Sequence, residues 1–267
     1  MSGYFEQIEL VKKYYDSDDE ENRFKGSWKQ VELINTKRFI SENFRKGNFV
    51  LDCSAGTGIY AEWLCELGYK VAVSDLSSEN ISKIKKKYGE DKFYSINQCN
   101  ACDMNIYGSD AFDYVLCLGP LYHLENNYWG QCISECIRVC KKGGYILFAY
   151  MPREYMTMEI MFHSKYKCTR DELIRLWREG RVETTVKGFH SCAYFASQED
   201  IKKISDNKDI KVISHFSVDY NIGYFYEKIQ GMNDFEINRL SEILYEFGKN
   251  NNILASSKHN LVWVKKE

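Results

Sequence analysis

The sequence predicts an α/β fold built on a mostly parallel sheet with helices on both faces. From residue 49 onwards, short apolar runs alternate with segments whose apolar residues recur at helical spacing. Strands that alternate with helices at this interval are typical of parallel sheets with right-handed crossovers. The chain has 267 residues, of which 44% are hydrophobic, so it can bury the core of one large domain with an elaborate cap.

The elements of the first half can be placed in chain order. Helices are expected over 4–15 and 28–44, and together they predict an N-terminal helical lid over residues 1–48. The core, residues 49–150, is expected to hold strands at 49–51, 70–74, 93–96, 112–118 and 145–149. The helix before the last of these strands is expected to run from about Tyr128 to Cys140, with Lys141 and Lys142 in its final turn.

The alternation breaks after Pro152. Two helices rich in Met and aromatic residues are expected over 154–163 and 170–179, so residues 151–195 are predicted to form a helical cap insertion. Residues 196–267 are expected to complete the core sheet, with a helix near 197, strands at 210–217 and 259–265, and helices around 221–229 and 233–248.

The composition limits the partners and the compartment. A net charge of −2 provides no basic field, so a nucleic-acid partner is not expected. No apolar run approaches the length of a membrane span, and the polar N-terminus does not read as a signal peptide. Ten cysteines in such a chain are expected to be reduced thiols, which predicts a cytoplasmic protein.

A turn of small residues follows the first strand. Residues 52–58 read Asp-Cys-Ser-Ala-Gly-Thr-Gly, and glycines there let a ligand approach the backbone at the N-terminus of the next helix. Asp75 ends the second strand, where a carboxylate can accept both ribose hydroxyls of an adenosine cofactor.

Two adenosine cofactors are compatible with this turn. The pattern Gly56-x-Gly58-x-x-Ala61 formally satisfies the dinucleotide fingerprint. Three features favour an adenosine that carries an amino acid. Asp52 would repel a pyrophosphate, roughly fifty residues precede the first strand, and residues 118–124 form a plausible wall for a reacting methyl group.

On these residues, segment 49–150 resembles the class I S-adenosylmethionine-dependent methyltransferases. The resemblance rests on five motifs in order: 51–58, 74–77, 112–115, 118–124 and 139–144. Tyr14-Tyr15-Asp16 and the tail 257–262 also resemble a bacterial subfamily of mostly unassigned substrate. The resemblance implies a Rossmann-like, seven-stranded sheet with an antiparallel last hairpin, and S-adenosyl-L-methionine as cofactor.

The resemblance also implies a set of cofactor-binding residues. The backbone of 54–58 would hold the methionine part, Asp75 the ribose and Leu76 the adenine, while Ser54 replaces the usual first glycine of the turn. Arg23 either pairs with the cofactor carboxylate or forms a salt bridge with neighbouring acids. The full expected set is Tyr15, Arg23, Asp52, Cys53, Ser54, Ala55, Gly56, Thr57, Gly58, Asp75, Leu76, Asn100, Ala101, Cys102, Leu118 and Gly119.

The expected reaction is in-line displacement at the sulfonium methyl, in which the protein supplies position and desolvation. His123 is the candidate base, although it could instead pack and hydrogen-bond the next helix; Tyr122 could shape the pocket or only pack. The acceptor is expected to contact Tyr14, Arg153, Tyr155 and His190, unless the cap residues form a core of their own.

The predicted function is methyl transfer to an N or O nucleophile of a small molecule. A nucleic-acid methyltransferase is the first alternative, although residues 119–122 lack the side-chain acceptor typical of base-amine methylation. An NAD-dependent oxidoreductase and a non-catalytic cofactor-binding protein stay open. No metal site is expected, because Cys132, Cys136 and Cys140 share one helix face typical of core packing. The oligomeric state is left open.

Overall fold

A seven-stranded sheet in the order β3-β2-β1-β4-β5-β7-β6 forms the centre of the computed structural model. The structure describes residues 2–17, 23–24, 26–162, 168–181 and 193–267. The first five strands are parallel, and β7 lies antiparallel between β5 and β6. This confirms the predicted fold class and the antiparallel last hairpin. The strands are β1 (Phe49–Asp52), β2 (Lys70–Asp75), β3 (Ser95–Gln98), β4 (Phe112–Cys117), β5 (Cys140–Tyr150), β6 (Ile210–Ser217) and β7 (Asn260–Lys266).

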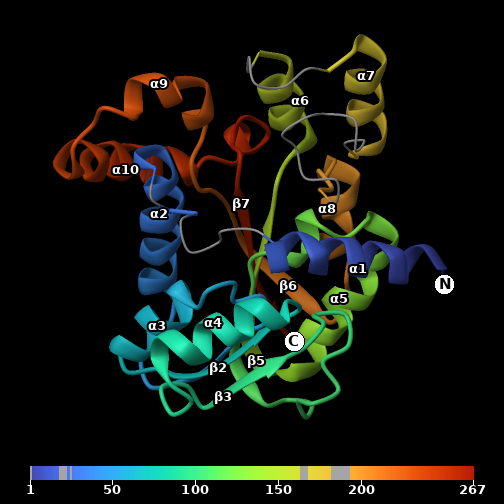
Figure 1. Ribbon diagram of the computed structural model, residues 1–267, viewed down its shortest axis with the longest axis vertical. Coiled ribbons are helices and arrows are strands. Elements are labelled where there is room, and N and C mark those ends of the chain that lie inside the picture. Colours follow the sequence, from blue (N-terminus) through green and yellow to red (C-terminus); the bar gives the residue numbers. More distant parts are fainter. Residues whose placement is uncertain (1, 18–22, 25, 163–167, 182–192) are drawn as a thin grey trace.

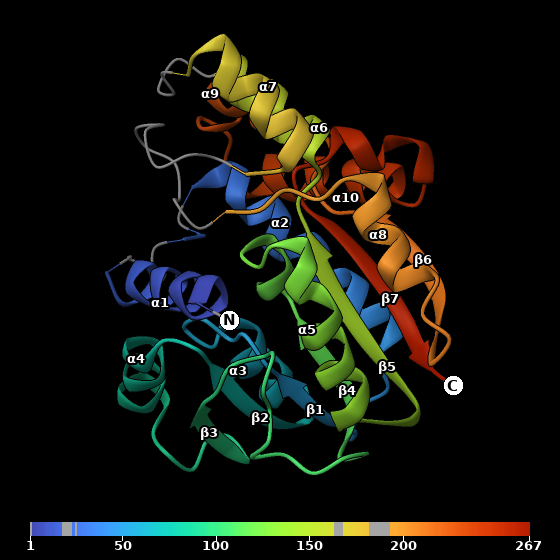
Figure 2. The same cartoon turned by 90° about the vertical axis from the view of Figure 1, so that its right-hand side faces the viewer.

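Helices cover both faces of the sheet because successive strand residues point to opposite sides. Leu51 packs in the cluster that includes α5 (Asn126–Val139) and α8 (Gln198–Ser205). Val50 packs on the other face, against α2 (Ser27–Asn43), α3 (Ile59–Glu66), α4 (Ser78–Tyr88) and α10 (Asp234–Gly248). Figure 2 shows α5 and α8 on one side of the strands, with α2 and α10 on the other.

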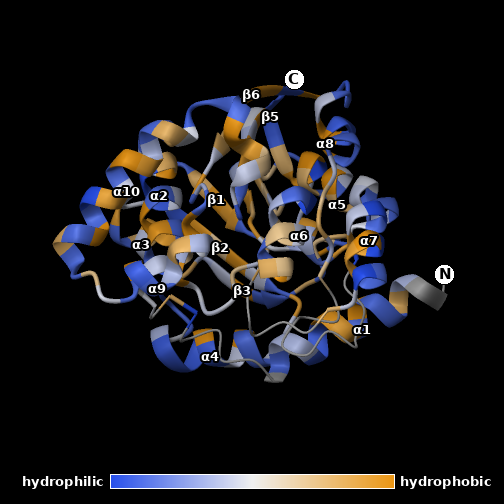
Figure 3. Cartoon of the chain, turned by 90° about the horizontal axis from the view of Figure 1, so that it is seen from above, coloured by the Kyte–Doolittle hydropathy of each residue, from blue (hydrophilic) through white to orange (hydrophobic). Residues whose placement is uncertain are grey.

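The hydropathy pattern follows these layers. Seen from above, the strands at the centre are mostly hydrophobic, and much of the outer surface of α4 and α8 is hydrophilic (Figure 3). In α4, Ile81 and Ile84 are buried while Lys85, Lys86 and Lys87 lie in the last turn, where cations favour the helix dipole. Within the described residues, no helix combines the length and the apolar character needed to cross a bilayer.

The boundary between α5 and β5 differs from the prediction. The helix ends at Val139, and Lys141 and Lys142 lie in β5 instead of in the last helical turn. Cys140 pairs with Phe112, and the register then shifts before Tyr145 pairs with Tyr114. Gly143 takes a φ of +76° in this bulged stretch. Gly143 and Gly144 form a pair that is typical of a helix stop. Here they lie in an irregular extension of β5, because β4 offers an edge with which this segment can pair.

Two helical parts lie beyond the carboxyl edge of the parallel strands (Figure 1). The first is α1 (Ser2–Ser17), which lies beside α4. The second contains α6 (Arg153–Phe162) and α7 (Arg170–Glu179), which share a core of Tyr155, Met156, Ile160, Leu176, Ala193 and Phe195. The short helix α9 (Tyr226–Ile229) precedes α10.

Candidate active site

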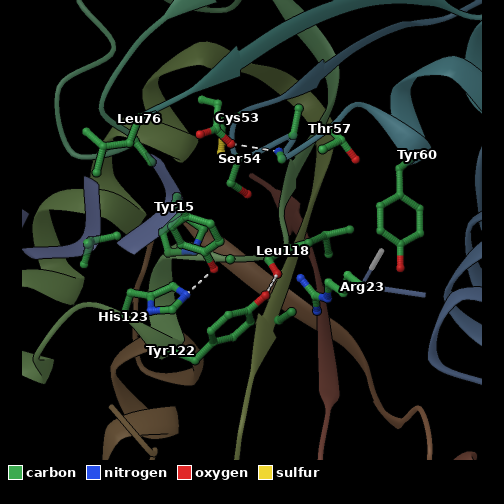
Figure 4. Close-up of a pocket in the computed structure, with 18 of the residues that line it drawn as sticks. Tyr15, Arg23, Cys53, Ser54, Thr57, Tyr60, Leu76, Leu118, Tyr122 and His123 are labelled. Carbon is green, nitrogen blue, oxygen red and sulfur yellow. Dashed lines mark hydrogen bonds between the residues drawn. The ribbon is translucent and has the colours of Figure 1, made fainter. Parts of the chain in front are cut away.

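A cavity lies where β1, β2 and β4 end, the edge at which open α/β sheets bind ligands. It encloses an empty volume of about 1130 Å³, part of it open to solvent. Figure 4 shows side chains from these strand ends converging with side chains from the N-terminal segment. The predicted residues that line it are Tyr15, Arg23, Cys53, Ser54, Ala55, Gly56, Thr57, Asp75, Leu76, Asn100, Ala101, Leu118, Gly119, Tyr122 and His123.

The glycine turn is fastened to the end of β2 by Asp75. Its Oδ2 accepts the Gly56 N–H at 2.8 Å, and its Oδ1 accepts from the Ser77 N–H at 2.8 Å and from the Asn80 amide at 3.2 Å. Burial raises the pKa of the Asp75 carboxyl, and these hydrogen bonds act in the opposite direction. They use three of the roughly four lone-pair directions of a carboxylate, so Oδ2 keeps capacity for a ligand hydroxyl.

Two polar groups of the turn have no hydrogen-bond partner among the residues that the structure describes. The Ser54 hydroxyl is buried, lines the cavity and is unpartnered. A Cβ built on Gly119 would lie 3.4 Å from the Ser54 Cβ and Oγ, so serine replaces the usual glycine by packing against a glycine opposite. Asp52 Oδ2 is also unpartnered, but Asp52 lies behind the turn and does not line the cavity.

The predicted adenine side is only partly as expected. Leu76 and Ala101 line the cavity, whereas Cys102 does not. The Asn100 side chain is engaged by the protein: its amide donates to the Tyr4 hydroxyl at 3.0 Å, and its Oδ1 accepts from the Cys102 N–H at 2.9 Å. These two bonds join the loop after β3 to α1. Gly58 does not line the cavity either; it begins α3 in the left-handed region with φ +82°.

Tyr122 and His123 form the wall after β4. The Tyr122 hydroxyl donates to the Leu118 carbonyl at 2.6 Å. His123 is buried, and its Nε2 lies 2.5 Å from the Tyr15 hydroxyl of α1. Gln7 of α1 donates to the His123 carbonyl at 2.7 Å. Tyr15 and Gln7 of α1 are therefore hydrogen-bond partners of this histidine, and the bond to Tyr15 is drawn in Figure 4.

Sequence reasoning missed the opposite wall of the cavity. Arg23 pairs with Glu32 at 2.8 Å, and Glu32 Oε2 lies 3.7 Å from Nδ1 of His259. Glu32 and Thr36 of α2 both line the cavity, with Tyr60 of α3, and burial raises the pKa of the Tyr60 hydroxyl. The spacing of four residues between Glu32 and Thr36 was an available signal, since it puts both on one helix face. Other lining residues that were missed are Ile8, Val11, Phe24, Ala149, Val218 and Leu261.

Of the residues expected to contact the acceptor, the three that the structure describes do not line the cavity. Tyr155 is 1% exposed within the core of the cap, and Arg153 donates to the carbonyls of Phe195 and Arg178. Tyr14 lies on α1 beside Tyr15 but outside the lining set. His190 lies outside the described residues. The apolar residues of segment 151–195 that the structure describes therefore form a core of their own, which was the alternative prediction for them.

A buried thiol cluster underlies the glycine turn. The sulfur atoms of Cys53, Cys117 and Cys136 lie within 4.8 Å of one another, and Cys132 Sγ is 3.8 Å from Cys117 Sγ. Such thiols could hold a soft metal ion if deprotonated. All four are buried in the hydrophobic cluster on the α5 face.

Comparison with known proteins agrees with this geometry. A family model described as a methyltransferase domain matches residues 51–148. The ubiquinone biosynthesis O-methyltransferase of Thiobacillus denitrificans is 27% identical over 149 residues, which are 54% of this chain. The chain matches about 60% of the length of that curated relative.

Solved structures show the same fold at low identity. A protein from Pyrococcus horikoshii OT3 superposes with a TM-score of 0.62 at 14% identity, covering 89% of this chain and 91% of that chain. The magnesium protoporphyrin IX methyltransferase of Synechocystis PCC 6803, with bound S-adenosylhomocysteine, superposes with a TM-score of 0.57 at 14% identity, covering 98% and 100%. Residues 51–148 therefore match a methyltransferase domain, and the glycine turn that Asp75 fastens lies within them.

Proposed function

We propose that this chain transfers a methyl group from S-adenosylmethionine to a nitrogen or oxygen of a small molecule. The observation that carries the proposal is a single cavity that joins the glycine turn, Asp75 and the Leu118–Gly119 wall. The N-terminal lid, the cofactor-binding core, the helical cap and the C-terminal completion of the sheet are the proposed divisions of the chain, at residues 1–48, 49–150, 151–195 and 196–267.

The residues present fit this cofactor. The unpartnered Ser54 hydroxyl and the Arg23 guanidinium provide polar groups for the amino-acid end. A buried hydroxyl without a partner costs about 1–3 kcal/mol, so a polar ligand atom there would relieve that cost. Asp75 offers an acceptor for a ribose hydroxyl, and Leu76 with Ala101 offers an apolar surface for adenine.

The cofactor supplies a methyl group that is already activated by the positive sulfonium. The protein therefore has to orient the acceptor and exclude water. Helix α1 covers the cavity through Tyr15, bonded to His123, and through Asp16, whose Oδ1 accepts from the Ser77 hydroxyl at 2.5 Å. Tyr122, fixed to the Leu118 carbonyl, is proposed to shape the transfer site.

His123 keeps its proposed place at the transfer site. Its Nε2 already shares a hydrogen bond with the Tyr15 hydroxyl, so it can take a proton only if that bond opens or Tyr15 passes the proton on. A second proposed role follows directly from the bond: His123 and Tyr15 hold α1 closed over the cofactor.

A small-molecule acceptor is favoured by two observations. The net charge of −2 gives little attraction for a nucleic acid. The curated relative is named for O-methylation in ubiquinone biosynthesis. Contacts of the acceptor with Tyr14, Arg153, Tyr155 or His190 stay predictions, and none of the first three reaches the cavity in this conformation.

The test is a thermal melt with S-adenosylhomocysteine and, separately, with NAD. A ligand at 100 times its dissociation constant adds about 2.7 kcal/mol of stability if it binds only the folded state. We expect a shift with S-adenosylhomocysteine alone, lost in Asp75→Ala and kept in Asp91→Ala, an exposed acid used as the matched control.

The other outcomes would contradict the proposal in different ways. A shift with NAD alone would indicate an oxidoreductase, and no shift with either would indicate a degenerate site. Labelled methyl transfer to a panel of phenols and amines, with total RNA as a separate arm, then distinguishes the small-molecule acceptor from nucleic acid.

A further inference from the structure

We infer that His259, oriented by Asp219, is the group that takes the proton from the N–H or O–H of the methyl acceptor. The inference rests on the proposed function, because a proton acceptor has a role only if methyl transfer occurs. It concerns a histidine of the tail segment 257–262, and it differs from the role predicted for His123.

The position of His259 follows from the sheet order. The cofactor side of the cavity is built at the ends of β1, β2 and β4. His259 precedes β7, and Asp219 follows β6. Because β7 runs antiparallel to β5, with Asn260 opposite Tyr150, the start of β7 lies at the same edge as the end of β5 (Figure 2). His259 therefore lines the cavity on the side away from Asp75.

The ring of His259 is held in one orientation. Its Nδ1 lies 2.7 Å from Asp219 Oδ2, and the other oxygen of Asp219 accepts the His259 backbone N–H at 2.9 Å. The Ser257 hydroxyl also donates to Asp219 Oδ1, at 2.8 Å. Asp219 is 1% exposed and His259 is 7% exposed. An ionised Asp219 keeps the ring proton on Nδ1, which leaves the lone pair on Nε2.

Nε2 is available to a ligand. Among the described residues, no side chain or backbone group forms a hydrogen bond with it. The Nε2 atom of His123, by contrast, is already bonded to Tyr15. A base whose other nitrogen is oriented by a buried carboxylate is the arrangement that proton acceptors use in nucleophile activation.

Two carboxylates lie close to the ring of His259. Asp219 Oδ2 lies 2.7 Å from Nδ1, and Glu32 Oε2 lies 3.7 Å from the same atom. Glu32 also pairs with Arg23, so it contributes only part of its charge. The adjacent Lys258 is engaged by Glu159 at 2.8 Å, which moderates its repulsion.

The step balances as follows. The proton of the acceptor N–H or O–H goes to Nε2 of His259, and the electron pair of that bond forms the new bond to the methyl carbon. The pair of the broken carbon–sulfur bond stays on sulfur, which becomes a neutral thioether. The proton then passes from His259 to water.

The first experiment needs no acceptor. Long-range ¹H–¹⁵N spectra of the full chain report the tautomer of each of its five histidines. The signal of His259, assigned by its loss in His259→Asn, is expected to show a protonated Nδ1 and a bare Nε2. In Asp219→Ala this preference should disappear. A proton on Nε2 in the neutral ring would overturn the inference whatever the activity.

The second experiment measures binding and transfer separately. Asparagine at 259 can still donate to Asp219 but has no Nε2, whereas His259→Gln supplies an amide that cannot take a proton. Both variants are expected to bind S-adenosylhomocysteine within about threefold of wild type and to lose roughly 10²–10⁴-fold in transfer. Labelled S-adenosylmethionine with phenols of graded acidity is the probe, and a phenol that is already ionised should lose much less.

Control variants test whether the loss of transfer is specific to His259. His215→Gln alters a partly buried histidine that is bonded to Tyr150 outside the cavity, and it should change neither quantity. Loss of cofactor binding in His259→Asn would overturn the inference and place His259 in the cofactor site. An equal loss for ionised and neutral phenols, or a selective loss in His123→Gln instead, would also overturn it. Failure of the wild type to bind S-adenosylhomocysteine would contradict the proposed function, not the tautomer.

Discussion

At the residue scale, the glycine turn depends on backbone angles that side chains oppose. Gly58 has φ +82°, and a Cβ there would lie 3.2 Å from the Tyr88 ring and 3.4 Å from Ile84. Gly68 has a similar φ of +88°, but a Cβ there would meet nothing within 4 Å. A side chain at either position thus has the same conformational cost, but only at position 58 would it also crowd neighbouring side chains.

We expect Gly68→Ala to lower the free energy of unfolding by about 1–2 kcal/mol, the cost of the left-handed region for an L residue. Gly58→Ala should lower it by about 1 kcal/mol more, because the methyl also overpacks against Tyr88. Urea denaturation of both variants measures the difference. Equal losses would mean that Tyr88 and Ile84 move aside without cost.

Asp52 provides a prediction about pH. Complete burial raises the pKa of its carboxyl well above the ordinary value of 3.8, and Oδ2 has no partner. The folded state then holds a proton that the unfolded state has released, so this contribution to stability is lost as the pH rises through the folded pKa. Asp52→Asn removes this dependence.

The comparison is urea denaturation between about pH 4 and pH 8, the range above the ordinary carboxyl pKa. Relative to Asp52→Asn, the wild type is expected to lose stability as the pH rises. The exposed Asp91→Asn serves as a control for loss of one charge. Parallel curves for wild type and Asp52→Asn would contradict the prediction.

At the element scale, α1 is fastened across the cavity by side chains from several parts of the chain. Tyr15 bonds His123, Asp16 bonds Ser77, and Tyr4 accepts from Asn100. These bonds join one short helix to the segments after β4, β2 and β3. The helix can therefore leave only if these contacts and the bond from Gln7 to the His123 carbonyl open together.

Tyr15→Phe removes one of these bonds but keeps the ring. A hydrogen bond contributes about 0.5–1.5 kcal/mol, so S-adenosylhomocysteine should dissociate up to about tenfold faster. Stopped-flow displacement measures this rate. Tyr14→Phe, on the same helix but outside the lining set, is the control and should leave it unchanged. The same rate in Tyr15→Phe and wild type would mean that the bond does not hold α1 closed.

The elements also show where local patterns were misleading. The Lys141–Gly144 segment carries a helix-stop pattern but extends β5, because β4 provides a pairing partner that no local window contains. The apolar residues of the cap indicated either a pocket lining or a core. Tyr155 and Met156 belong to the core, since α7 and residues 193–195 pack against them.

At the scale of the whole molecule, burial controls thiol chemistry. Among the described cysteines, Cys65 and Cys168 are partly exposed and the others are buried: Cys53, Cys99, Cys102, Cys117, Cys132, Cys136 and Cys140. Burial also raises the pKa of the Cys99 and Cys140 thiols to about 12, which further lowers their reactivity.

Iodoacetamide is therefore expected to modify Cys65 and Cys168 in the native protein, while the buried thiols react only through opening of the fold. Saturating S-adenosylhomocysteine should slow the modification of the buried cysteines, because it stabilises the folded state. It should leave the modification rate of Cys65 unchanged. Mass spectrometry of timed samples measures each site. Modification of Cys117 or Cys132 as fast as Cys65 would contradict the described packing.

The sequence by itself determined the parallel core, the glycine turn and the place of Asp75, because each depends on a hydrophobic period or a turn within a short window. It also identified most of the cofactor side of the cavity, since the ends of parallel strands meet at one edge. In the sequence, Ser54 is a departure from the usual first glycine of the turn. Its packing against Gly119 and its unpartnered hydroxyl, among the described residues, are seen only in the structure.

Only the tertiary structure decided which distant side chains complete the cavity. The Tyr15–His123 bond joins residues 108 positions apart, and the Asp219–His259 bond joins residues 40 positions apart. These contacts depend on where α1 lies and on β7 entering the sheet between β5 and β6. Such packing is set by burial over the whole chain, so no local pattern of residues encodes it.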